Sequence, residues 1–232
     1  MGGNCLTHLD TEGRRWFANE ALLVLPVEND LPGLATRVVR VRKPRPAASE
    51  RGLERALSLH TGEQWNILPG DRFFLFRHPT WGNFTVGICS DLLDPMPWAL
   101  LRGEVAHMFF SAYNDDVDLF GVVTRTRAYE DYCNVVLVNH GSKGGSFAWS
   151  PRTGPTKEIA RFQGEDLDVV ADVTLPVRAL LEAQRRRLPM AIDDHRISWL
   201  GESRDRNESD SDRELRKYKT PPPGYRKRGE GQ

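Results

Sequence analysis

With 232 residues, of which 39% are hydrophobic, the chain is long enough to bury a substantial core. Its 32 lysines and arginines balance 32 aspartates and glutamates, so its net charge predicts no general attraction to nucleic acid or to a membrane. No run approaches the roughly 18 apolar residues of a transmembrane helix, so no stable membrane insertion is expected. The three widely spaced cysteines, Cys5, Cys89 and Cys133, predict free thiols in a reducing, cytoplasmic compartment.

Short strand-like runs recur over the first 173 residues. The segment 36–41 alternates apolar and basic residues, which is the two-residue period of a half-buried strand. The glycine-rich stretch 141–145 separates two such runs and predicts a hairpin turn. The predicted strands are residues 21–27, 36–41, 72–77, 83–89, 119–124, 134–138, 146–149 and 168–173.

Three segments show the spacing of helices. Residues 49–59 follow a possible cap at Ser49, residues 97–113 carry apolar side chains at helical spacing, and residues 176–188 begin with proline. Strand runs broken by isolated helices predict an α+β fold with a mainly antiparallel sheet and two or three helices. The absence of a regular strand–helix alternation argues against a doubly wound nucleotide-binding fold.

The composition changes after Leu200. Residues 201–232 carry few large apolar side chains, with acidic residues first and basic residues around a proline triplet later. Such a segment cannot bury enough apolar surface to offset its ordering entropy. The sequence therefore predicts a globular domain over residues 1–200 and a disordered, charged, proline-containing tail over residues 201–232.

Two kinds of cysteine are distinguished by their surroundings. Cys5, preceded by Asn4, is a candidate papain-like nucleophile if it begins a helix, with His140 as its base and Asp193 or Asp194 as the orienting group. Cys89 and Cys133 lie in apolar strand-like runs, where a cysteine is usually a small buried hydrophobe. The leading prediction assigns no catalytic residue.

The sequence predicts no metal and no cofactor. The six histidines are scattered singly, and no cysteine or histidine pair has the spacing of a zinc site. No phosphate-binding glycine motif precedes a helix pattern, because the 141–145 stretch is followed by another strand-like run. Nothing in the sequence indicates the oligomeric state.

Basic side chains gather in three segments. One lies along the predicted strand 36–41 and its exit, one ends the last predicted helix, and one follows the proline triplet. Such clusters can contact an acidic protein partner or phosphate backbones, although exposed strands often carry them for solubility. The predicted contact residues are Arg40, Arg42, Arg185, Arg186, Arg187, Arg226, Lys227 and Arg228.

The two ends of the chain resemble a picornavirus leader protein, the first product of a viral polyprotein. The chain begins at Met1, and the basic run 226–228 precedes the terminal Gly229-Glu230-Gly231-Gln232. Picornavirus main proteases cleave after glutamine, so a leader protein would end in this way. Some leader proteins are papain-like proteases with an Asn-Cys-Trp motif, whereas here Leu6 follows Asn4-Cys5.

This resemblance implies a non-enzymatic viral accessory protein of the host cytoplasm that binds host or viral proteins. Two alternatives stay open. One is a papain-like cysteine leader protease that uses Cys5 and His140. The other is an RNA-binding accessory protein that uses the arginine clusters.

Overall fold

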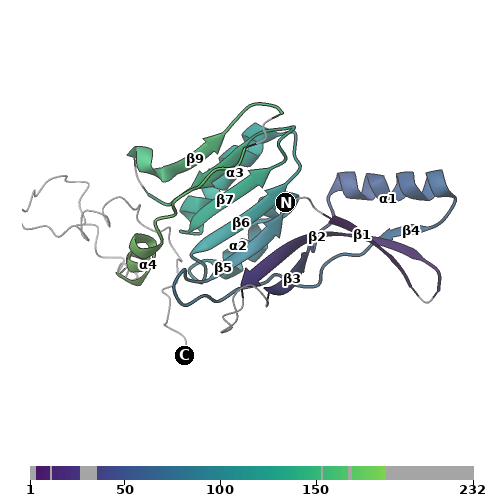
Figure 1. Cartoon of the computed structure of the whole chain (residues 1–232), viewed down its shortest axis with the longest axis horizontal. Coiled ribbons are helices and arrows are strands. Elements are labelled where there is room, and N and C mark those ends of the chain that lie inside the picture. Colours follow the sequence, from purple (N-terminus) through teal and green to yellow (C-terminus); the bar gives the residue numbers. More distant parts are fainter. Residues whose placement is uncertain (1–3, 11, 27–35, 153, 167–168, 187–232) are drawn as a thin grey trace, which may run out of the picture.

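The computed structural model describes residues 4–10, 12–26, 36–152, 154–166 and 169–186. These residues form two β-sheets and four α-helices, so the predicted α+β class is confirmed (Figure 1). Four of the seven strand pairings among them are antiparallel, and each sheet is mixed because it also contains parallel pairing. The predicted tail, residues 201–232, lies outside the described residues, and so does the predicted domain boundary.

The first sheet is a meander with one added strand. Strands β1 (Asn4–Leu9), β2 (Arg15–Pro26) and β3 (Thr36–Arg42) pair antiparallel in chain order. The helix α1 (Ala48–Thr61) then leads to the short strand β4 (Trp65–Ile67), which pairs in parallel with the start of β2. The strands predicted at 21–27 and 36–41 and the helix predicted at 49–59 are confirmed.

The second sheet has five strands in chain order. Strands β5 (Phe84–Ile88), β6 (His107–Ala112) and β7 (Asn134–Asn139) are parallel, and β8 (Ser146–Trp149) and β9 (Glu158–Phe162) continue antiparallel. Parallel neighbours need crossover connections, which here contain helices. The predicted hairpin at 141–145 is confirmed as the β7–β8 connection.

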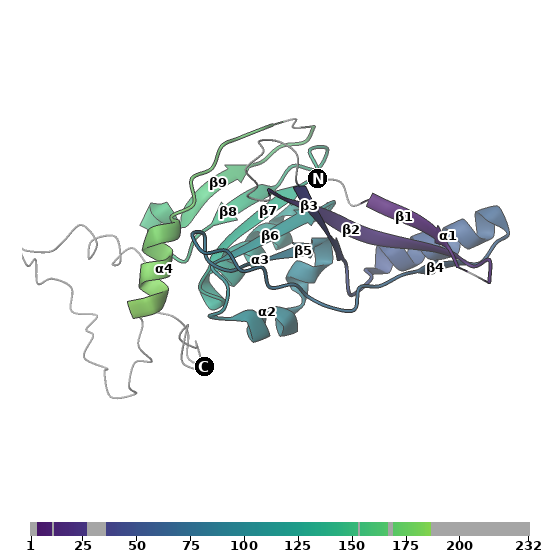
Figure 2. The ribbon, with the colours of Figure 1, turned by 60° about the horizontal axis from the view of Figure 1, so that its bottom comes forward.

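The crossovers place helices on one face of the second sheet (Figures 1 and 2). The 3₁₀ helix η1 (Cys89–Leu93) and α2 (Pro95–Leu101) join β5 to β6, and α3 (Val117–Glu130) joins β6 to β7. The 3₁₀ helix η2 (Gly154–Lys157) precedes β9, and α4 (Val177–Arg186) lies at the opposite end of the molecule from α1.

The main core lies between these helices and the second sheet. Its members are apolar side chains at most 4% exposed, and they alternate along the strands as the period of two requires. They include Leu92, Trp98, Met108, Phe110, Phe120, Ala128, Val135, Leu137, Phe147 and Trp149. A smaller cluster joins the two sheets, where Ala21 and Val41 of the first pack near Ile88 of the second.

The strand predicted at residues 119–124 is wrong, because this segment forms the middle of α3. The side chain of Asp116 accepts a hydrogen bond from the backbone of Leu119 at 3.1 Å and caps the helix. Phe120, Thr124 and Ala128, four residues apart, form its buried side. Packing at helical spacing therefore overrides the strand propensity of the valines between them.

The long helix predicted at residues 97–113 is also wrong in its second half. Helix α2 ends at Leu101, and Gly103 adopts a positive φ of 83°, a conformation that glycine takes without strain. The chain then forms β6, in which Met108 and Phe110 face the core. Similarly, the segment 72–77 pairs only through a bridge between Phe76 and Phe84, and residues 169–173 form no strand.

Candidate functional site

Cys89 occupies a strained position at the carboxyl end of β5. Its φ is +49°, in the left-handed region, where a side chain costs about 1 kcal/mol or more. The turn leads directly from the strand into η1, and a sharp strand-to-helix turn is a geometry that presents a nucleophile at the edge of a sheet. The residue is half-buried, and its Sγ lies 3.9 Å from the backbone oxygen of Tyr113.

The ends of three parallel strands meet around this thiol. Tyr113 follows β6 and His140 follows β7, and their rings lie 5.1 Å apart in an edge-to-face arrangement. In mixed and parallel sheets, ligands bind outside the carboxyl ends of the strands. Cys89 therefore lies at the edge of the sheet where ligands of such folds bind, partly buried against the neighbouring core clusters.

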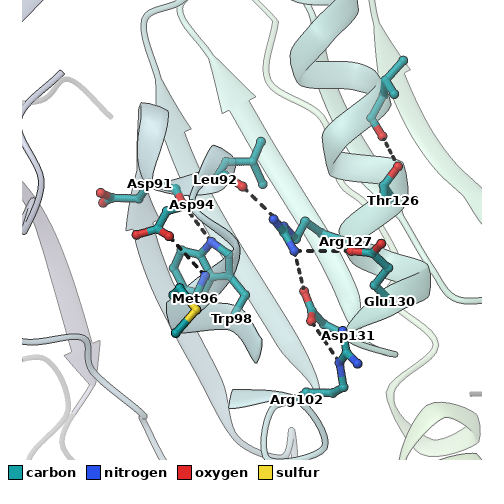
Figure 3. A network of polar contacts seen from close by, with 11 residues as sticks. Asp91, Leu92, Asp94, Met96, Trp98, Arg102, Thr126, Arg127, Glu130 and Asp131 are labelled. Atoms are coloured by element: carbon teal, nitrogen blue, oxygen red, sulfur yellow. Dashed lines mark hydrogen bonds and ion pairs between the residues drawn. The ribbon is translucent and has the colours of Figure 1, made fainter. Parts of the chain in front are cut away.

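Side-chain hydrogen bonds of Asp91 in η1, Trp98 in α2 and Arg127 in α3 fix the turn after Cys89 (Figure 3). The backbone N–H of Ile88 donates to Asp91 Oδ2 at 2.9 Å. The indole Nε1 of Trp98 donates to the backbone oxygen of Asp91 at 2.8 Å, and Arg127 Nε donates to that of Leu92 at 3.4 Å. These contacts stabilise a backbone conformation that Cys89 would otherwise not favour.

Asp91 links the turn electrostatically to a second part of the chain. Burial raises the pKa of Asp91 to about 6, against the lowering effects of the Ile88 hydrogen bond and of the positive charge on Lys43. The negative charge of Glu50 acts in the raising direction. Lys43 and Glu50 therefore lie within electrostatic reach of the turn that carries Cys89.

Lys43 and Glu50 form a buried ion pair directly after β3. Lys43 is 3% exposed, and its Nζ lies 2.9 Å from Glu50 Oε2. Glu50, in the first turn of α1, also accepts hydrogen bonds from Asn19 Nδ2 at 2.6 Å and from the backbone of Ala47 at 2.5 Å. Because a buried ammonium group needs a partner, this arrangement fixes one positive charge inside the protein at a defined place.

A second charged cluster lies beneath η1. Asp131 is fully buried, with Arg102 at 3.6 Å and Arg127 at 4.0 Å from its carboxylate (Figure 3). Burial raises the pKa of Asp131 to about 6, while Arg127 and then Arg102 act to lower it. This cluster orients the Arg127 side chain that holds η1.

The predicted papain-like arrangement is not present. Cys5 lies within β1, opposite Asn19, and not at the start of a helix. His140 follows β7, where its Nδ1 lies 2.8 Å from the Ser142 hydroxyl. The predicted orienting residues, Asp193 and Asp194, lie outside the described residues.

The prediction for the other two cysteines is half right. Cys133 is fully buried, and burial raises the pKa of its thiol well above the usual value. Cys89, by contrast, is only partly buried and ends its strand in a strained turn. Cys89 is therefore the less buried cysteine of this pair.

The structure describes four of the eight predicted contact residues, and they lie on two separate elements, β3 and α4. Arg40 and Arg42 pair with the buried carboxylate of Glu20 at 3.3 Å and 2.8 Å, which compensates their charge within the sheet. Arg185 is exposed near the end of α4, and Arg186 is the last residue of that helix. Arg187, Arg226, Lys227 and Arg228 lie outside the described residues, so a partner contact at these positions stays a prediction.

The sequence does not predict Lys43, Glu50 and Cys89 as a group. It places Lys43 only at the exit of a basic strand and predicts Cys89 to be a buried core residue. One available signal was the apolar run 83–89 followed at once by Ser90 and Asp91, which indicates a strand that ends at the cysteine.

Across the described ranges, no three histidine, cysteine, aspartate or glutamate side chains are grouped so that they could hold a metal ion. In the same ranges, no helix has the length and apolar character needed to cross a membrane.

No protein-family model and no curated protein sequence matches the chain. Solved structures with a similar arrangement include Nit3 of Saccharomyces cerevisiae, a member of branch 10 of the nitrilase superfamily (18% identity, TM-score 0.45, 71% of this chain and 55% of that one). Another is an amidase from Nesterenkonia sp. AN1 in complex with butyramide (13% identity, TM-score 0.44, 70% and 56%). A third is XC1258 from Xanthomonas campestris, a CN-hydrolase superfamily protein (17% identity, TM-score 0.45, 73% and 66%).

The chain thus spans 55 to 66% of the length of these three structures. The TM-scores of these structures are below 0.5 and their identities below 20%, so they do not assign an activity to this chain.

These similar structures correct the functional prediction. They are nitrilase-superfamily proteins and amidases, and none of the three is a viral leader protein. The resemblance to picornavirus leader proteins is therefore wrong. So are the interpretations that depend on it, namely a non-enzymatic accessory role, polyprotein processing and the host cytoplasm. The papain-like protease and the RNA-binding accessory protein are not supported either.

Proposed function

We propose that the chain hydrolyses an amide-type carbon–nitrogen bond with Cys89 as the nucleophile. The observation that carries this proposal is the strained left-handed backbone of Cys89 at the carboxyl end of a parallel strand. Backbone strain of this kind persists where the surrounding structure enforces it, and it occurs frequently at active sites. The buried Lys43–Glu50 pair close to the same turn adds a fixed charge to the site.

The proposed reaction follows the chemistry of an acyl-transfer thiol. The Sγ of Cys89 attacks the carbonyl carbon, a carbon–sulfur bond forms, and the carbon–nitrogen bond breaks as the amine leaves with the proton that the thiol gives up. Water then hydrolyses the thioester, which releases a carboxylic acid and restores the thiol. The two products are an amine, or ammonia from a primary amide, and an acid.

The role we assign to Lys43 is electrostatic. Negative charge develops on the carbonyl oxygen during the attack, and a preorganised positive group stabilises it most strongly away from water. Lys43 provides such a group, because its side chain is 3% exposed and is held by Glu50. Glu50 acts as a positioning residue, since both of its oxygens accept hydrogen bonds from neighbouring groups.

The proposed catalytic thiol also requires a reducing cellular compartment. Cys89 and Cys133 are free cysteines, and a nucleophilic thiol must stay reduced to act. A cytoplasmic location fits this requirement and forms part of the proposal.

The test compares two cysteine variants of the full-length protein. Ammonia release from butyramide and acetamide is measured for the wild type, Cys89→Ala and Cys133→Ala. We expect Cys89→Ala to abolish ammonia release and Cys133→Ala to retain it, because the Cys133 thiol is buried in the core. Mass spectrometry of the wild type during turnover should show the acyl group on the peptide that contains Cys89. Equal activity of Cys89→Ala and the wild type would disprove the proposal.

A further inference from the structure

A pocket of about 550 Å³ lies between the exit of β3, helix α1 and the segment that follows β4. Proline, with its fixed φ, supplies three of its seven lining residues, so the shape of the rim is largely preset. The lining residues are Pro44, Arg45, Pro46, Arg51, Glu54, Ile67 and Pro69.

The pocket is lined by two arginines and one glutamate, and one of the two arginines forms no ion pair within the described ranges. The guanidinium of Arg45 forms an ion pair with Asp94. The carboxylate of Glu54 accepts a hydrogen bond from the backbone N–H of Ile67 at 3.1 Å, which fixes its position in the wall. Arg51, three residues before Glu54 on α1, has no ion pair or side-chain hydrogen bond with any other described residue. Guanidinium groups bind planar oxyanions through paired N–H donors.

The pocket borders both the Lys43–Glu50 ion pair and the turn that begins at Cys89. Pro44 follows Lys43 directly in the chain, so one wall continues into the buried ion pair. On the other side, Arg45 contacts Asp94, which caps α2 at the end of the turn that begins at Cys89. A substrate bound at Cys89 therefore has this pocket as a neighbour, in which the exposed Arg51 offers a guanidinium that is unpaired in the described part of the chain, beside the carboxylate of Glu54.

We propose that this pocket is a subsite for an oxyanion group of the substrate, a carboxylate or a phosphate, which Arg51 recognises. The inference rests on the proposed function for the reaction and adds the substrate class. It predicts that the preferred amide carries a negative charge at the end away from the bond that is cleaved.

Binding is measured first, without turnover, on the full-length Cys89→Ser protein by calorimetry with inorganic phosphate and with glutarate. We expect Arg51→Ala to weaken binding roughly ten- to a hundredfold, as for the loss of a charge-assisted hydrogen bond. Glu54→Gln should tighten binding about three- to tenfold, because it removes a negative charge that repels the anion. The glutamine keeps an oxygen that accepts the hydrogen bond from the backbone N–H of Ile67. The matched control is Arg55→Ala, an exposed arginine on the same helix outside the pocket.

Kinetics then connects the pocket to the reaction. With the monoamide of glutaric acid, Arg51→Ala should raise KM by the factor found for glutarate binding, whereas the KM for the neutral pentanamide should stay unchanged. Arg55→Ala should match the wild type with both amides.

The outcomes separate the two proposals. If neither amide is hydrolysed, the proposed function fails, and the binding series still decides the subsite. If neither probe binds, or if Arg51→Ala and Arg55→Ala bind the probes equally, the subsite is refuted. If glutarate alone binds, the group is a carboxylate, and if phosphate alone binds, it is a phosphate.

Discussion

Replacing Asp91 by asparagine should change how the stability of the protein depends on pH. Asp91 is 3% exposed, and one of its two carboxylate oxygens, Oδ1, has no hydrogen-bond partner in the described structure. Its pKa is raised from 3.8 to about 6, chiefly by burial. Because the folded protein binds this proton more tightly than the unfolded chain, the stabilisation is complete below pH 4 and is lost as the pH rises through about 6.

The size of the effect follows from the pKa. Each pKa unit corresponds to about 1.4 kcal/mol, so the whole effect of Asp91 on the free energy of unfolding is about 3 kcal/mol, of which about 2 kcal/mol should be lost between pH 4.5 and pH 7.5. Asparagine keeps an oxygen that can accept the hydrogen bond from Ile88 but has no charge to bury. The free energy of unfolding of Asp91→Asn, measured relative to the wild type, should therefore rise by about 2 kcal/mol over this range.

The measurement is urea unfolding followed by circular dichroism, at half-unit steps from pH 4.5 to 7.5. Asp131, whose pKa is also raised to about 6, is present in both proteins, so its contribution cancels in the difference. The control is Asp118→Asn, because this carboxylate on α3 is exposed. A difference between Asp91→Asn and the wild type that stays constant across the range would refute the reasoning.

Two further predictions concern packing around the site, and both are read from urea unfolding. Gly87→Ala would place a Cβ 2.5 Å from Phe110 Cε1, so it should destabilise by about 1–3 kcal/mol. Gly52→Ala, whose Cβ meets nothing within 4 Å on α1, should instead stabilise by up to about 1 kcal/mol, and equal effects of the two would contradict this account. Asn139→Ala removes hydrogen bonds to the Asn114 backbone (3.0 and 2.9 Å) and to the Gly144 oxygen (2.7 Å), so a loss of about 2–4 kcal/mol is expected. A loss below about 0.5 kcal/mol, typical of surface substitutions, would show that these contacts do not join the loops after β6 and β7.

The sequence predicted best the elements whose local pattern agrees with their packing. Strand β8 was predicted with its observed bounds, because 146–149 is a short apolar run after a clear glycine turn. Helix α1 is predicted by the helical spacing of its leucines, but its N-cap is Ala47 rather than the expected Ser49, and none of its residues is buried. Helix α3 was missed because the strand-like valines Val122 and Val123 lie on it beside a buried stripe that becomes visible only in three dimensions.

The candidate site was harder to predict for a physical reason. Lys43 and Glu50 are seven residues apart, and Cys89 follows 39 residues later on the other sheet. Their proximity depends on the packing of Val41 against Ile88 between the two sheets, a tertiary contact that no periodicity encodes. The left-handed backbone at Cys89 is equally invisible in the sequence, since glycine would be the residue expected in that conformation.

The parallel pairing of β4 with β2 has a consequence for the order in which the protein folds. Strands β1, β2 and β3 are neighbours in the chain and can associate early, whereas Arg15 meets Trp65 only after a 50-residue loop has closed. Helix α1 lies inside that loop, so its docking and the arrival of β4 should occur in one late, rate-limiting step. Lys43 and Glu50 also lie in that loop, so enzymatic competence should emerge more slowly than the bulk of the secondary structure during refolding.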